Sequence, residues 1–166
     1  MNWKRFTKFA GKVILAHVVT YFIVGSVAYQ LITHELYVGE NPIFAEFMRS
    51  QAEPELWSHV MIWFLPAQIL RGLLIAGVLY PFFGTLMGWN LGKRWAAISG
   101  LYLVLGFWAA AVAAPGTIEG FVYLRPEIPL AVQLKVQPEI IIQGILLGLW
   151  VGWWMRSKEQ RKTSAE

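Results

Sequence analysis

The sequence contains no cysteine and no aspartate. The lack of cysteine excludes disulfides, zinc ribbons and cysteine-ligated iron–sulfur clusters. The ten acidic residues are all glutamates, so an aspartate-based catalytic triad is excluded. The sequence also contains no nucleophile elbow, phosphate loop, zincin helix or dinucleotide-binding fingerprint. We therefore assign no catalytic residue and expect no cofactor.

Charged residues are also scarce. They make up 14% of the 166 residues, whereas hydrophobic residues make up 57%. An ordinary soluble domain has roughly 25% charged and 45–50% apolar residues. Because a small domain must cover itself with polar surface, this composition argues against a soluble enzyme and excludes a disordered chain. It favours membrane lipid as the main solvent, and nucleic acid is not an expected partner.

Four apolar segments are long enough to cross a membrane as helices, which takes about 20 residues. The second segment exceeds that length, so we expect it to be broken or kinked near Pro66 and Pro81. The sequence thus predicts an all-α integral membrane protein, a four-transmembrane-helix bundle that forms a single membrane domain over 1–166. The expected spans are 13–32, 60–91, 95–114 and 138–155.

Basic residues gather in three places: the N-terminal arm, the connection between the second and third spans, and the tail 156–166. Together these regions hold ten basic residues and two glutamates. By the positive-inside rule, both termini are expected on the cytoplasmic side of the plasma (inner) membrane. The connections 33–56 and 115–137 then face outward.

Each outer connection has a pattern of its own. Asn41-Pro42 is followed by apolar residues at helical spacing, which predicts a short amphipathic helix on the outer surface. Residues 130–137 alternate between apolar and mostly polar side chains, which predicts a strand. With 118–124 as its partner, this strand would form a small extracytoplasmic β-hairpin. The alternative is an extended loop over the helix ends.

Arg71 is the outstanding charge inside a predicted span. An unpaired arginine at the centre of a membrane costs about 2.5–3.5 kcal/mol, so a partner is expected. We expect Arg71 in the outer half of the membrane, with Gln68, Glu119, Glu139 and Gln143 as candidate pairing or ligand residues. Three interpretations stay open. Arg71 either fixes helix packing as a buried pair or a snorkelling side chain, binds an anionic or lipid-headgroup ligand, or belongs to a proton or ion pathway.

Histidines and glycines supply the remaining candidates. His34 and His59 are weak candidates for a metal site, because no two histidines share a metal-ligand spacing. Glycines recur at every fourth residue in two ridges, and such ridges let helix backbones approach closely, either within one bundle or between subunits. The two ridges are Gly84, Gly88 and Gly92, and Gly144, Gly148 and Gly152.

These features favour a non-enzymatic protein that acts through association, as an accessory subunit or a homo-oligomer. The expected partners are membrane lipid and either a membrane protein or a second copy of the chain. The alternative is a small transporter or a lipid- or anion-binding membrane protein with an outward-facing polar site around Arg71. A membrane-embedded enzyme is the third interpretation, and it depends on the glutamates and histidines alone.

Overall fold

The computed structural model describes residues 3–40, 42–46, 48–110, 112–124 and 126–155. The predicted tail 156–166, Asn41 and Arg125 lie outside the described residues. Within them the regular structure is entirely helical, with no strand, which confirms the all-α prediction for this part of the chain. Three helical stretches are long and apolar enough to cross a membrane, namely Trp3–Val38, Pro54–Gly88 and Leu130–Trp154.

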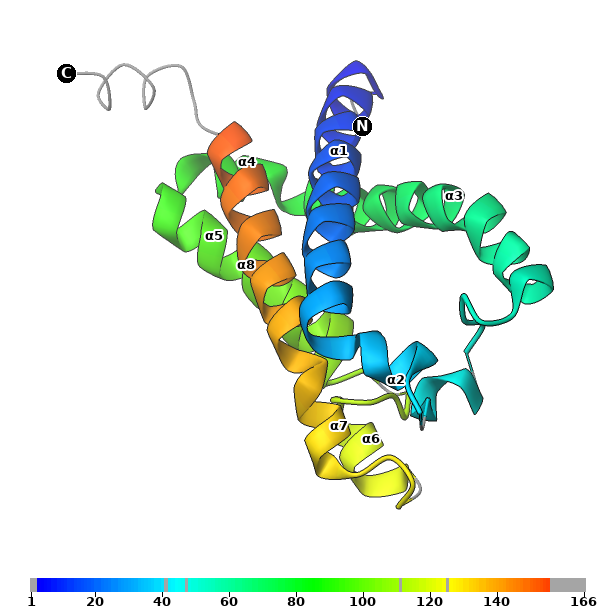
Figure 1. Ribbon diagram of the computed structural model, residues 1–166. Helices are drawn as coiled ribbons and strands as arrows, with labels where there is room; N and C mark the ends of the chain where they lie inside the picture. Colours follow the sequence, from blue (N-terminus) through cyan, green and yellow to red (C-terminus); the bar gives the residue numbers. More distant parts are fainter. Residues whose placement is uncertain (1–2, 41, 47, 111, 125, 156–166) are drawn as a thin grey trace.

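The first stretch is continuous through three elements. It consists of α1 (Trp3–Ala28), the π-helical η1 (Tyr29–Thr33) and α2 (His34–Val38). A straight helix of its 36 residues would be about 54 Å long, whereas the hydrocarbon core is about 30 Å thick. The chain bends where α1 passes into α2 (Figure 1), so α2 leaves the direction of α1.

The second stretch is α3 (Pro54–Leu79), the 3-10 turn η3 (Tyr80–Phe82) and α4 (Phe83–Gly88). Proline is favourable at the start of a helix, and α3 begins at Pro54 rather than at Pro66, which lies in its interior. The chain changes to 3-10 geometry around Pro81. Figure 1 shows α3 crossing α1 and extending away from the other long helices.

The third predicted span is helical over a shorter range than expected. It forms α5 (Leu91–Gly100) and the π-helical η4 (Leu101–Trp108), and the helix ends before the predicted boundary at Ala114. The Asn90 side chain caps its start by accepting a hydrogen bond from Lys93 N at 2.9 Å. At its end, the Trp108 indole donates to Gln137 Oε1 at 2.9 Å. This bond fastens η4 to the beginning of α8 (Gln137–Trp154).

One glycine ridge packs inside the chain and the other does not. A Cβ at Gly148 would lie 3.0 Å from the Trp95 carbonyl oxygen, and one at Gly144 would lie 2.7 Å from the Leu103 side chain. The Ser99 hydroxyl also donates to the Gly144 carbonyl at 2.9 Å, so α5–η4 and α8 meet backbone to backbone. By contrast, a Cβ at Gly84 or Gly88 would meet nothing within 4 Å, and one at Gly92 would meet only Asn90 Oδ1.

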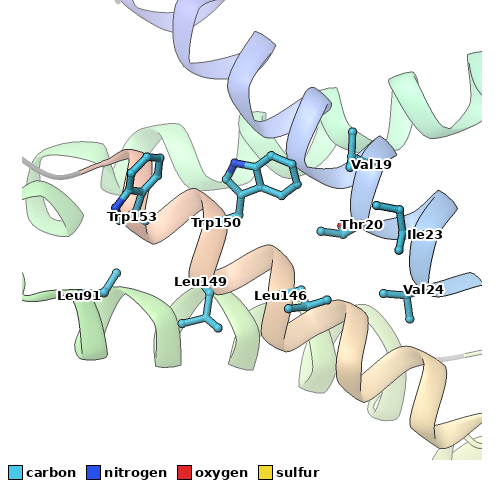
Figure 2. A pocket seen from close by; sticks show the side chains of 9 residues that line it. All are labelled: Val19, Thr20, Ile23, Val24, Leu91, Leu146, Leu149, Trp150 and Trp153. Atoms are coloured by element: carbon cyan, nitrogen blue, oxygen red, sulfur yellow. The ribbon is translucent and has the colours of Figure 1, made fainter.

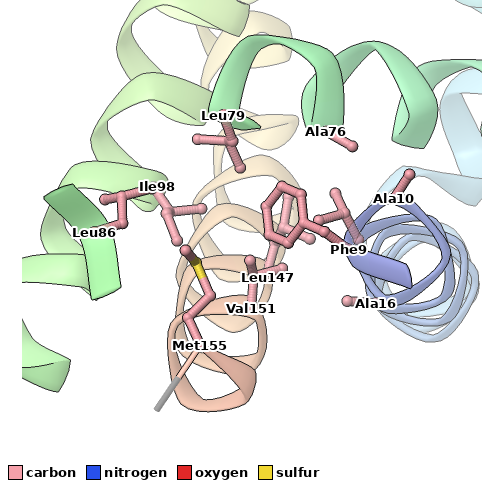
Figure 3. Packing of buried hydrophobic residues seen from close by; sticks show 11 residues of the cluster. Phe9, Ala10, Ala16, Ala76, Leu79, Leu86, Ile98, Leu147, Val151 and Met155 are labelled. Atoms are coloured by element: carbon pink, nitrogen blue, oxygen red, sulfur yellow. The ribbon is translucent and has the colours of Figure 1, made fainter. Parts of the chain in front are cut away.

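The main hydrophobic core joins α1, α3, α4, α5 and α8. Figure 3 shows its side chains converging from these helices. The start of α1, the start of α5 and the end of α8 lie at one end of the bundle (Figure 1). We call it the basic end, because the basic residues of 3–12 and 93–94 lie there. The buried core residues are Phe9, Ala10, Val13, Ala16, Ala76, Leu79, Leu86, Ile98, Leu147, Val151 and Met155.

The opposite end is covered by a layer that we call the cap. It consists of α2, the 3-10 turn η2 (Ile43–Glu46), α6 (Ile118–Tyr123) and α7 (Leu130–Lys135). Leu36, Phe44 and Val132 form its small core, and Lys135 pairs with Glu35. The predicted amphipathic helix is a single 3-10 turn whose Phe44 is buried.

The β-hairpin predicted for 118–137 is wrong, because both of its arms are helical in the cap. The Thr117 side chain accepts a hydrogen bond from Gly120 N at 2.8 Å and so begins α6. Pro129 stands immediately before α7. Alternation from 130 to 137 indicated a strand, but in α7 it is Val132 and Gln133 together that are buried. The cap of α6 and the proline before α7 outweigh a weak period-2 pattern.

Candidate functional site

Polar side chains from α1, α3 and η4 meet in the middle of the apolar bundle. His17 is fully buried on α1, and its Nε2 lies 3.1 Å from Gln68 Oε1 on α3. With the amide oxygen as acceptor, His17 Nε2 carries the proton. The His17 ring also packs near Tyr102 of η4, with 6.3 Å between ring centroids. Three elements thus contribute to one polar cluster.

Arg71 lies beside this cluster, at the edge of a groove between α3 and α5–η4. The guanidinium carbon is 5.7 Å from the centroid of the Tyr102 ring, a cation–π arrangement. The groove has a volume of about 310 Å³. We call it the Arg71 groove, and its lining is apolar apart from Arg71 and Tyr102. The other lining residues are Leu74, Ile75, Val78, Leu79, Ile98, Leu101, Leu105, Gly106 and Leu147.

The contacts of Tyr102 indicate where Arg71 lies along the bundle. A Cβ at Gly144 would lie 3.0 Å from Tyr102 Cδ1, so Tyr102 packs close to the middle of α8. Arg71 beside Tyr102 is therefore level with the middle of α8 rather than with its outer end. Arg71 lies here because α3 crosses α1 at the next residue, Gly72. A Cβ at Gly72 would lie 2.8 Å from Ile14 Cα.

The candidate partners of Arg71 have other contacts or lie in other elements. Gln68 bonds to His17 instead. Glu139, in the first turn of α8, has its Oε1 3.4 Å from where a Cβ of Gly25 would lie, and Glu119 is in the first turn of α6 in the cap. Among the described residues, no carboxylate forms an ion pair with Arg71.

Two buried polar atoms near the cluster lack protein partners. His17 Nδ1 and Gln143 Nε2 make no hydrogen bond within the described part of the chain. The Gln143 side chain lies on α8 and is 3% exposed. Buried polar groups are normally satisfied, so these atoms mark places where water or a ligand would be stabilised.

The two candidate metal ligands take part in aromatic contacts. The His34 ring packs at 5.2 Å from the Tyr29 ring, and the His59 ring at 6.3 Å from the Trp63 ring. Residues 3–155, with their gaps, contain no group of three or more histidine and glutamate side chains that could hold a metal ion.

A second groove separates α1 from α8 and holds no charge. Figure 2 shows it between Val24 and Ile23 on one side and Trp150 and Leu149 on the other. Its volume is about 460 Å³. Thr20 is polar, but its hydroxyl donates to the Ala16 carbonyl at 2.7 Å. This α1–α8 groove therefore presents an apolar surface.

Sequence reasoning missed Tyr102 and both grooves. A tyrosine in an apolar run is an ordinary residue until the fold places Arg71 over its ring, and a groove exists only between packed helices. The one signal available was the charge of Arg71 itself. Comparisons of the chain with protein-family models, curated proteins and solved structures find no match.

Proposed function

We propose that the protein is an integral membrane protein that binds the anionic head of a membrane amphiphile in the Arg71 groove. The observation that carries this proposal is the guanidinium at the edge of an apolar groove, with no carboxylate among the described residues paired to it. An arginine within a span is costly and is by default a functional-site hypothesis. A bound carboxylate or phosphate would offset that cost.

The walls of the groove favour an amphiphile over a small soluble anion. Leu74, Val78 and Leu105 line the groove and are 62%, 60% and 64% exposed, so it opens sideways onto the surface that lipid would cover. An acyl chain lying along these side chains removes apolar surface from contact with water or detergent. The ligand class is therefore an acyl chain with an anionic head.

The proposal includes four membrane crossings with both termini on the cytoplasmic side. Besides the three long helical stretches, the third predicted span, α5 with η4, also crosses the membrane in this proposal. It packs along α8 through Gly144 and Gly148, so the two lie at the same depth. The basic residues of the start of α1 and of Lys93-Arg94 lie at one end of the bundle, which the positive-inside rule assigns to the cytoplasm of an inner membrane. Single cysteines at exposed Gln51 and Lys93 test this arrangement, because only the first should react with an impermeant reagent added outside cells.

Electron paramagnetic resonance with spin-labelled lipids tests the binding site. The purified protein in phosphatidylcholine nanodiscs receives trace spin-labelled stearate, phosphatidylglycerol or phosphatidylcholine, and the motionally restricted fraction gives relative affinities. Wild type should prefer the anionic probes. Arg71→Gln should lower that preference about tenfold or more, because a hydrogen bond to a charged group contributes about 1.5–3 kcal/mol.

Arg49→Gln is the matched control, since it removes one exposed positive charge outside the groove and should leave the preference intact. Equal losses in the two variants, or no preference in wild type, would contradict the proposal. A loss confined to phosphatidylglycerol would assign the groove to phosphate heads, and a loss confined to stearate would assign it to carboxylates.

Association is the second candidate function, and the open faces of Gly84 and Gly88 favour it. Small residues that have no close neighbour among the described residues allow another helix to approach closely. Gly84→Leu with Gly88→Leu should then dissociate an oligomer or release a co-purifying subunit in mild detergent. Wild-type protein that is strictly monomeric and without a partner would remove this candidate.

A further inference from the structure

A second charged pocket lies at the basic end, between α1, α4 and α8. Its volume is about 190 Å³, and three of the nine lining residues are the cations Arg5, Lys8 and Lys12. None of the lining residues within the described part of the chain is acidic. The other six are Phe9, Phe83, Met87, Val151, Trp154 and Met155. We call it the basic-end pocket.

Helical spacing places the three cations on one side of α1. Positions 5, 8 and 12 are one and two turns apart, so their side chains share a face. Like charges at this spacing repel one another and destabilise an isolated helix. An anion lying among them would convert that repulsion into attraction.

Aromatic rings of the other two helices hold two of the cations at the pocket. The Arg5 guanidinium carbon lies 4.3 Å from the centroid of the Phe83 ring on α4. Lys12 Nζ lies 5.9 Å from the Trp154 ring on α8. Cation–π contacts of this kind orient the charged groups at the pocket. The pocket is therefore a tertiary feature, and not only a basic stretch of sequence.

The apolar part of the lining distinguishes a lipid head from a soluble anion. Phe83 and Met87 are partly exposed and offer surface that suits the glycerol and first methylene groups of a phospholipid, while the cations suit its phosphate. Trp154 is the kind of residue that anchors helices at headgroup level. Basic pockets between membrane helices on the cytoplasmic side are suited to anionic phospholipid heads.

We propose that the basic-end pocket is a binding site for the phosphate head of an anionic phospholipid, separate from the Arg71 groove. It lies at the bundle end where the basic residues meet, whereas Arg71 is level with the middle of α8. The two sites therefore differ in depth and in every lining residue.

Thermal shift of the full chain in zwitterionic detergent tests this site. The Arg71→Gln background removes the charge of the other groove, so the two proposals can fail independently. The probes are dioctanoyl phosphatidylglycerol, dioctanoyl phosphatidylcholine and sodium phosphate. We expect stabilisation by phosphatidylglycerol alone, and Lys8→Gln with Lys12→Gln should weaken the apparent affinity at least about tenfold.

Lys4→Gln with Lys93→Gln is the matched control, because it removes two exposed charges at the same end but outside the pocket. The affinity of this control for phosphatidylglycerol should stay within about threefold of that of the Arg71→Gln background. A loss as large as that of Lys8→Gln with Lys12→Gln would show diffuse attraction to a basic surface and overturn the site. Inorganic phosphate acting as well as the lipid would overturn the lipid assignment. If the double variant does not fold, Lys12→Gln against Lys4→Gln makes the same comparison, and Lys8→Arg with Lys12→Arg should retain binding.

Discussion

The α1–α8 groove and the Arg71 groove are built from the same kind of apolar helix, yet only one of them holds a charge. The α1–α8 groove is larger, at about 460 Å³ against about 310 Å³. Its one hydroxyl, that of Thr20, bonds to its own helix. The Arg71 groove has a guanidinium at its edge and a tyrosine ring beneath it. The two grooves therefore differ less in size than in the polar group at the edge.

The difference arises from the neighbours that each groove has. Tyr102 lies within cation–π distance of Arg71, and Gln68 bonds to buried His17 close by. A charge in the α1–α8 groove would meet only leucine, isoleucine, valine and tryptophan side chains and a satisfied hydroxyl. The membrane cost of a charge is the same in both places, but only the Arg71 groove has groups that reduce it.

The largest expected effect comes from moving the charge between grooves. Leu146→Arg places an arginine in the α1–α8 groove near the middle of α8, and should lower the free energy of unfolding in detergent by about 2.5–3.5 kcal/mol. Arg71→Leu, the reverse change in the other groove, should raise it. Thermal unfolding of both variants and of wild type measures the two changes in stability. Equal stability of Leu146→Arg and wild type would break the comparison.

The next effect comes from crowding Tyr102, a lining residue of the Arg71 groove, from the side of α8. Gly144→Leu would overlap Leu103, which lies 2.7 Å from the added Cβ, and should cost about 1–3 kcal/mol. It should also reduce binding of spin-labelled stearate by displacing Tyr102. Leu149→Ala in the α1–α8 groove is the control and should leave that binding unchanged. Gly144→Leu that binds like wild type would show that the packing of Tyr102 against α8 is not needed for binding.

A smaller effect is expected from the ring beneath Arg71. Tyr102→Leu removes the cation–π contact and should lower the affinity for the anionic probe by about two- to thirtyfold, corresponding to about 0.5–2 kcal/mol. Tyr102→Phe keeps the ring and should bind nearly as well as wild type. If the phenylalanine variant is as weak as the leucine variant, the hydroxyl rather than the ring holds the ligand.

The smallest effect concerns the His17–Gln68 hydrogen bond. A double-mutant cycle with His17→Ala and Gln68→Ala should give a coupling energy of about 0.6 kcal/mol, as is typical between membrane helices. The free energy of unfolding in detergent is the readout. Coupling near zero would mean that the bond contributes nothing to joining α1 and α3.

Long apolar runs and glycine spacing predicted much of the fold. The helical character of α1, α3, α5 and α8 follows from runs that contain few charges, and Gly148 packs closely as its ridge suggested. The cap was predicted less well, because single capping contacts such as that of Thr117 decide short helices. For the site, the sequence predicted Arg71 as its centre, but neither Glu119 nor Glu139, both expected beside it, forms an ion pair with it among the described residues.

By itself, the sequence determined that the chain is helical and apolar, that its basic residues are concentrated, and that Arg71 is exceptional. These properties depend on composition and on short-range spacing, which a linear chain displays directly. Only the tertiary structure decided that Tyr102 lies beneath Arg71, and that Gly144 and Gly148 pack closely while Gly84 and Gly88 remain open. It also decided that Arg5 and Lys12 of α1 lie over rings of α4 and α8. Such pairings depend on how α3 crosses α1 and on the register of α5 against α8, and those are set by packing between residues far apart in the chain.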